Sequence, residues 1–219
     1  MQTTKTMISR FGASASVVGG LLWAALFLRT EFNQTNDLSV LGIFLALQVL
    51  ADLCVLIGFI SLHIYLAKHY QDIQKRSVSL IVGWLAFVIG IIGLLLLLLY
   101  DLDYLLVSSD VETGIGWGIA GVSYLLGLLF LGLGLVLMGS VCVLAGIRYY
   151  WSASLIVMGL ALWVFLRSTS YWEDAAFSGT LVWVLFSLGW VYLGYLMIFG
   201  RIRKQPSGWQ SQPNASQPR

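Results

Sequence analysis

The chain has 219 residues, of which 59% are hydrophobic and only 10% are charged, and its formal net charge is +2. Soluble domains carry about 25% charged residues, so these charges are too few to cover a surface that faces water, and lipid must serve as the outer solvent. The small net charge gives no indication of a nucleic-acid partner, and the apolar runs fit a single membrane domain.

Six apolar segments follow one another along the chain and predict an all-α bundle of six transmembrane helices. A helix needs about 20 residues to cross a hydrocarbon core of about 30 Å, and runs this continuous favour helices over the alternating strands of a barrel. The fifth run is the shortest, so we expect Tyr150–Trp151 and Tyr171–Trp172 at the two membrane interfaces. The segments are Phe11–Leu28, Leu41–Ala67, Val78–Tyr100, Trp117–Ile147, Ala153–Leu166 and Leu181–Phe199.

The distribution of basic residues predicts the side of the membrane on which each end of the chain lies. With six helices and the N-terminus in the cytoplasm, only Arg29 and Arg167 of the 12 Lys and Arg residues fall outside. Cytoplasmic segments are enriched in Lys and Arg, so we expect a multi-pass protein of the cell (plasma, or inner) membrane with both termini in the cytoplasm. Residues 1–204 are expected to form the transmembrane domain. Residues 205–219, rich in Gln, Ser and Pro, are expected to be a disordered cytoplasmic tail.

Small residues recur at helical spacing in three of the predicted helices. Such residues allow helices to approach one another closely in lipid, so we interpret the stripes as packing surfaces inside the bundle. A homo-oligomer or another membrane protein as partner is left open. The stripes are Gly12, Ser16, Gly20 and Ala24 in the first helix, Gly83, Ala86, Gly90 and Gly93 in the third, and Gly118, Gly121, Gly127, Gly132, Gly134 and Gly139 in the fourth.

Asp52 is a charged residue well inside an apolar run, VLADLCVLIGF. A carboxylate near the middle of a bilayer costs at least about 2.5–3.5 kcal/mol, so such residues usually face the bundle interior and often have a function. Gln48 and His63 lie within about 40° of Asp52 around the helix axis, although His63 is about 16 Å farther along it. We therefore name Asp52, Gln48 and His63 as a candidate proton or ligand site, and expect Asp52 to be buried and protonated. The alternative is a structural role, in which a neutral Asp52 is hydrogen-bonded to a neighbouring helix.

No other sequence pattern indicates a catalytic or metal site. The acidic stretch that begins with Tyr100-Asp101-Leu102-Asp103 is interpreted as a solvated outer loop, because its spacing matches no calcium-binding loop. Two histidines are too few for a histidine-box di-iron enzyme, and neither a His-Glu-x-x-His nor a Gly-x-Ser-x-Gly motif occurs. We therefore expect no enzymatic activity, no catalytic residue, no metal and no cofactor, with the lipid bilayer as the main partner.

The stretch Val49–Tyr70, VLADLCVLIGFISLHIYLAKHY, resembles the second helix of a family of uncharacterised bacterial six-helix membrane proteins with a domain of unknown function. In that family an Asp-Leu pair precedes a short basic cytoplasmic loop, and here Asp52-Leu53 and Lys68–Arg76 match these features. The resemblance extends to the Gly- and Leu-rich Leu125–Gly146, although Arg148-Tyr149-Tyr150 stands where family members often have a Pro-Arg pair. The resemblance implies six helices and directs attention to Asp52, but it brings no activity with it.

Three hypotheses of function follow from the sequence. The first is a non-enzymatic accessory or interaction role in the membrane, the second a small proton- or cation-coupled transporter that uses Asp52, and the third a lipid-modifying membrane enzyme. A hydrophilic path that reaches Asp52 from one side would favour transport, whereas a sealed apolar surround would favour the accessory role. An enzyme would need several polar groups that converge at one interface.

Overall fold

A computed structural model of the chain describes residues 2–32, 38–70, 76–107, 115–145, 147, 149–168 and 175–199, and describes side chains within 10–27, 42–67, 80–103, 121–145, 147, 150–166 and 182–199. The described residues form six α-helices and no strand. The tail predicted for residues 205–219 lies outside the described residues. The helices are α1 (Gln2–Phe32), α2 (Leu38–Tyr70), α3 (Arg76–Val107), α4 (Ile115–Leu144), α5 (Tyr149–Ser168) and α6 (Ala175–Phe199).

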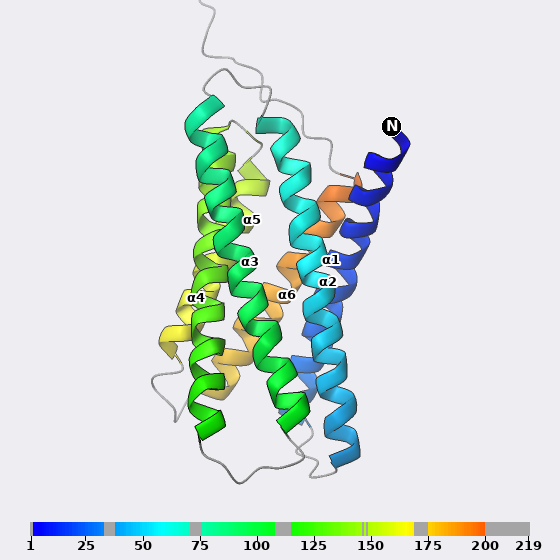
Figure 1. Cartoon of the computed structure of the whole chain (residues 1–219), viewed down its shortest axis with the longest axis vertical. Helices are drawn as coiled ribbons and strands as arrows, with labels where there is room; N and C mark the ends of the chain where they lie inside the picture. The colour runs from blue at the N-terminus through cyan, green and yellow to red at the C-terminus, as the bar shows by residue number, and fades with distance from the viewer. Residues whose placement is uncertain are drawn as a thin grey trace, which may run out of the picture.

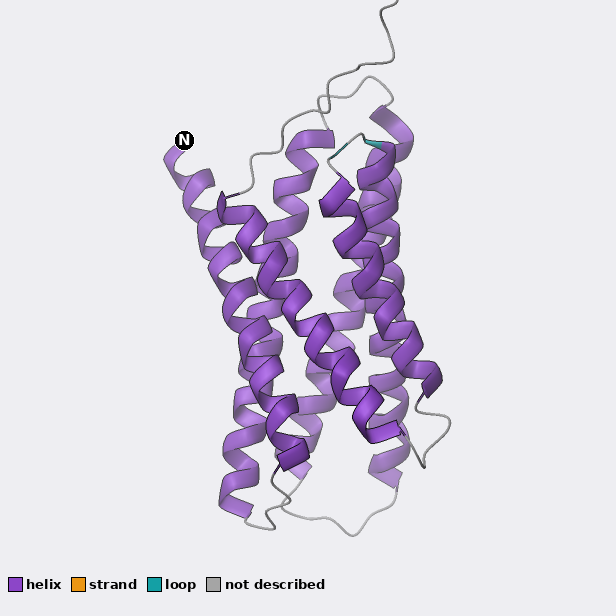
Figure 2. Ribbon diagram, turned by 180° about the vertical axis from the view of Figure 1, so that it is seen from behind, coloured by secondary structure: helices purple, strands orange, loops and turns teal. Residues whose placement is uncertain are grey.

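The helices run alternately up and down, so α1 begins and α6 ends at the same end of the bundle (Figure 1). We call this the proximal end and the opposite one the distal end. Each helix packs against its neighbours in sequence, and α6 returns to pack against α1, so the six helices close into a ring. Figure 2 shows the same helices from behind, with all six roughly aligned along the long axis.

The prediction of an all-α membrane bundle is confirmed. Five helices, α1 to α4 and α6, contain stretches long and apolar enough to cross a membrane, whereas the apolar stretch of α5, Tyr150–Leu166, is shorter. In lipid all backbone polar groups must be paired within the protein, and a helix pairs them within one segment. The six observed helices match the six predicted segments in order, and most extend several residues beyond them.

Two helix ends near residues 144–151 show details that the sequence did not predict. The fourth helix ends at Leu144 rather than Ile147, and the N–H of Ile147 donates to the carbonyl of Cys142 over 3.0 Å, a bond typical of a helix C-terminal cap. The side chain of Trp151, at the start of α5, is fully buried and stacks on Tyr65 of α2 with ring centroids 5.4 Å apart, and its place at a membrane interface stays a prediction. Tyr171–Trp172 lies outside the described residues.

The closest packing divides the ring into two groups of three helices. α1 packs most closely against α2 and α6, and α4 packs most closely against α3 and α5. We call α6, α1 and α2 the first half and α3, α4 and α5 the second half. The seam is the region where the halves meet, between α2 and α3, between α5 and α6, and in the centre of the ring.

Within each half most glycines of the predicted small-residue stripes bring helix backbones into contact, but Gly121 does not, because no atom lies within 4 Å of a Cβ added there. A Cβ added to Gly134 of α4 would lie 2.6 Å from Cα of Gly90 in α3, and one added to Gly159 of α5 would lie 2.5 Å from the carbonyl oxygen of Gly132. In the first half, a Cβ on Gly20 of α1 would lie 2.6 Å from the carbonyl oxygen of Ser187 in α6. Side chains larger than hydrogen at these positions would push the helices apart.

The seam is packed mainly by large side chains, some of which lie against glycines of the facing helix. Phe59 of α2 stacks on Phe87 of α3 with ring centroids 5.8 Å apart and also contacts Gly90. Between α5 and α6, Phe165 meets Trp183 edge-on at 5.5 Å. The halves are therefore joined mainly through side chains, whereas the helices within a half touch through their backbones.

Candidate functional site

Asp52 of α2 faces the interior of the bundle, as expected, and is only 2% exposed. The indole N–H of Trp23 in α1 donates to its Oδ1 over 2.8 Å. The other oxygen, Oδ2, receives no N–H or hydroxyl hydrogen bond from a described residue. A buried acceptor without a donor costs about 1–3 kcal/mol, so the group opposite Oδ2 determines what this site can do.

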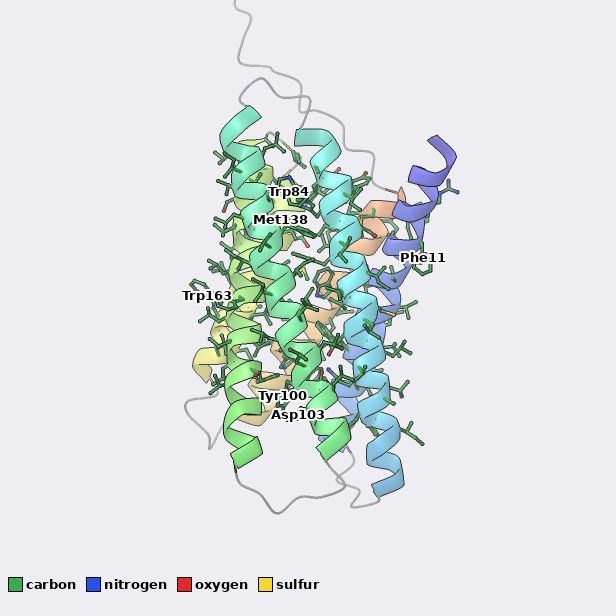
Figure 3. All side chains as sticks on the ribbon, in the orientation of Figure 1. Phe11, Trp84, Tyr100, Asp103, Met138 and Trp163 are labelled. Atoms are coloured by element: carbon green, nitrogen blue, oxygen red, sulfur yellow. The ribbon has the colours of Figure 1, made fainter. Side chains whose placement is uncertain are left out.

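The side chain that meets Asp52 across the seam is Asp101 of α3. It is buried at 8% exposure, and its side chain lies within interaction range of the side chains of Asp52 and Gln48. The expectation of a solvated loop at this point is wrong, because α3 continues to Val107 and places Asp101 on the buried face that also carries Leu94 and Leu97. Asp103 lies about 200° farther around the same helix, and its side chain is exposed (Figure 3).

Aromatic residues from α3, α4 and α6 surround the carboxyl pair. Tyr124 of α4 lies close enough to Asp52 and Asp101 for their charges to act on its hydroxyl, and its ring centroid is 4.9 Å from that of Tyr100. The hydroxyl of Tyr124 lies beside the indole N–H of Trp183, although this N–H completes no hydrogen bond of good geometry. Trp183 in turn packs edge-on against Trp23 at 5.6 Å. Five of the six helices thus contribute to the site.

No basic side chain in the described part of the bundle balances the two acids. Among the residues whose side chains are described, Arg10 is the only Lys or Arg, and it lies in the proximal part of α1. An ionised carboxylate only accepts hydrogen bonds, so a bond between Asp52 and Asp101 needs a proton on one of them. Two neighbouring carboxylates in an apolar interior strongly resist carrying two charges. The arrangement is therefore suited to hold one exchangeable proton, or a small cation in its place.

Of the three predicted site residues, Gln48 and Asp52 are brought together and His63 is not. Gln48 lies beside Asp101 at the pair. His63 is buried nearer the proximal end, where its ring stacks on Phe87 with centroids 4.0 Å apart and meets Trp84 edge-on at 4.8 Å. Figure 3 shows Trp84 toward the proximal end of α3 and Tyr100 toward the distal end, so His63 and the carboxyl pair occupy different levels.

The described residues include no group of three or more His, Cys, Asp and Glu side chains that could hold a metal ion. The two carboxyl groups and the Gln48 amide supply oxygen ligands only, which suit hard cations. Neither Cys54 nor Cys142 forms a disulfide, and Cys142 is buried among the core side chains. Proton exchange is therefore the chemistry that these side chains support most directly.

Comparison with protein-family models, with curated proteins and with solved structures finds no match for this chain.

Proposed function

We propose that the chain is a small multi-pass protein of the cell membrane that takes up and releases a proton at the Asp52–Asp101 pair, and acts as a proton- or cation-coupled transporter. The observation that carries this proposal is the contact between two buried carboxyl groups from opposite halves of the bundle. Buried acids inside membrane helices are costly and recur in proton relays and ion pathways.

The position of the pair at the seam supports coupling rather than a purely structural role. Asp52 belongs to the first half and Asp101 to the second, so the protonation of the pair affects how the halves attract each other. With one proton the carboxyl groups share a hydrogen bond, and without it two negative charges repel at short distance in a medium of low dielectric constant. Loss of the proton therefore favours separation of the halves, and its return favours closure.

The proposal places both termini in the cytoplasm, with the carboxyl pair in the outer part of the membrane. The distribution of Lys and Arg supports this orientation. A reporter enzyme that is active only outside the cytoplasm, fused after Lys204, should give no signal, whereas fusion after Asp110 should give one. The opposite pattern would place the termini outside and the carboxyl pair toward the cytoplasmic side of the membrane.

Proton uptake by proteoliposomes tests the function itself. Purified protein is reconstituted around a pH-sensitive dye, and the outside is acidified under an imposed membrane potential. Wild-type protein should acidify the lumen, whereas Asp52→Asn and Asp101→Asn should fold normally and lose uptake. Asp103→Asn, which removes an exposed acid from the same helix, is the matched control and should behave as wild type.

The accessory role remains the alternative outcome of this test. Uptake that is equal in wild type and in both Asn variants, together with an infrared spectrum that shows no titrating carboxyl band, would contradict the transport proposal. The same pair would then serve to lock the two halves together. The third hypothesis, a lipid-modifying enzyme, is the least supported, because a lipid would have to reach carboxyl groups that are almost fully buried.

A further inference from the structure

Four buried polar nitrogens outside the carboxyl pair have no hydrogen-bond partner in the described part of the molecule. They are Nε2 of His63 and the indole Nε1 atoms of Trp151, Trp183 and Trp190, all on side chains at least nine-tenths buried. The large majority of buried polar atoms in proteins bond to the protein or to ordered water. Four such groups in one small bundle therefore need a common explanation.

The four nitrogens are spread along the axis from the carboxyl pair to the proximal end. Trp183 lies beside Tyr124 at the level of the pair. Trp190 is about 10 Å farther along α6, and its ring lies 6.1 Å from that of Phe59. On α2, His63 is about 16 Å from Asp52. Trp151 is stacked on Tyr65, which is about 20 Å from Asp52 along the same helix.

His63 and Trp151 lie at the seam, and Trp183 and Trp190 are buried in the core, where Trp183 also stacks on Phe27 of α1 within the first half with ring centroids 4.5 Å apart. His63 contacts α3 through Phe87 and Trp84, Trp151 of α5 contacts α2, and Trp183 lies beside α4 and α5 as well as α1. Trp190 meets Phe59, which itself reaches across to Gly90 of α3. The unpaired nitrogens therefore lie at the seam or next to it.

We propose that internal water molecules along the seam bond these four nitrogens and form a proton path from the Asp52–Asp101 pair to the proximal end of the bundle, with His63 as a carrier on it. This inference rests on the proposed function, and supplies the part of the route that the carboxyl pair lacks. Water in proteins typically bonds two to four polar groups that otherwise have no partner.

The step at His63 needs no other reactant. A proton on a neighbouring water moves to the Nε2 lone pair, the ring becomes an imidazolium, and a proton then leaves to the next water in the chain. No bond other than N–H and O–H bonds forms or breaks, and both ring nitrogens of histidine can carry a proton. The ring contacts of His63 come from Phe87 and Trp84, which carry no charge. Asp52, Asp101 and Tyr124 face each other at the distant end of the path.

Hydration of the seam can be tested separately from transport. The full-length protein, with its tryptophans labelled with ¹⁵N, is transferred to D2O in detergent micelles, and indole N–H exchange is followed by NMR. The indoles of Trp151 and Trp190 should exchange nearly as fast as that of Trp84, which is 54% exposed. The indole of Trp23 is equally buried but donates to Asp52, so it should exchange much more slowly. Exchange at Trp151 and Trp190 as slow as at Trp23 would overturn the proposal.

The role of His63 is tested by replacing its nitrogen atoms while keeping an aromatic ring of similar size. His63→Phe should retain the stacking on Phe87, leave the titration of the carboxyl band unchanged and slow proton uptake by about a hundredfold, the lower end of what a positioned proton carrier contributes. Trp84→Phe changes the lipid-facing neighbour of His63 and should have no effect. Uptake that is normal in His63→Phe but lost in Asp52→Asn would refute the path and leave the proposed function standing.

Discussion

The interfaces inside each half of the bundle and the seam between the halves are built in different ways. Inside the halves, glycines let backbones touch, as where Gly134 faces Gly90. At the seam, aromatic rings and two carboxyl groups fill the space. Backbone-to-backbone packing leaves no freedom to adjust, because neither helix can move a side chain out of the way. Side-chain packing can change by rotation of rings and by loss of one proton.

This difference suggests two rigid units joined by an adjustable contact. Packed interfaces move between a few discrete arrangements rather than deforming continuously, and here the side chains able to change lie together at the seam. The carboxyl pair lies at this contact, so the loss or gain of one proton there changes how strongly the two halves attract each other. Three substitutions test the comparison by adding volume inside a half, removing charge at the seam, or adding volume at the seam.

The largest effect is expected from Gly134→Val, which adds two methyl groups and a Cβ against the backbone of Gly90. Overpacking of a close interface costs about 3 kcal/mol when no side chain can yield, so α3 and α4 should separate and the fraction of folded protein should fall. Thermal unfolding in detergent measures the change. Gly121→Val on the same helix is the control, because no atom lies within 4 Å of its added Cβ. Equal losses in both variants would show that helix propensity, and not packing, is responsible.

An intermediate effect is expected from Asp52→Leu. This substitution leaves the indole N–H of Trp23 without its acceptor and Asp101 without its partner. A buried donor left unpaired costs about 1–3 kcal/mol, so the melting temperature should fall. Asp52→Asn retains an acceptor for Trp23 and should fold with nearly normal stability. A stable Asp52→Leu protein would mean that the hydrogen bond of Trp23 contributes little to holding the halves together.

The smallest effect is expected from Gly189→Ala at the contact between α5 and α6. The added Cβ would lie 2.5 Å from Sδ of Met158, and methionine is flexible enough to move aside. Replacing a helical glycine by alanine gains about 1 kcal/mol, which should roughly offset this movement. Gly134→Ala meets backbone atoms instead and should be clearly destabilised in the same assay. Similar stabilities of the two alanine variants would remove the distinction between the seam and the interfaces within each half.

Most of the fold follows from the sequence, because apolar runs and small-residue spacing are local patterns. Six helices, the packing role of Gly20 and Gly90, and the burial of Asp52 were all predicted in this way. Asp101 was missed because it stands next to Leu102 and Asp103 at the end of an apolar run, where acidic residues usually begin a loop. One signal was present: Asp101 falls on the helical face of Leu94 and Leu97, both buried, whereas Asp103 does not.

The pairing of helices could not be predicted, since a helical wheel describes only one helix. It placed His63 on the same stripe as Asp52, and this is correct for α2 alone. The neighbours of each residue depend on the helix that faces it. Both residues face α3, but Asp52 lies opposite Asp101 and His63 lies opposite Phe87. The candidate site was therefore half predicted, with its second carboxyl group supplied by the tertiary structure.

The composition of the two halves has a consequence for the order in which the protein is made. The second half consists of α3, α4 and α5, which are consecutive in the chain, whereas the first half consists of α1, α2 and α6. A ribosome releases segments in order, so the second half can assemble while α1 and α2 still wait for the last of the described helices. Until α6 arrives, Gly20 lacks the backbone of Ser187 and Trp23 lacks Trp183. The environment of Asp52 is therefore completed last during synthesis, although Asp52 itself is translated early.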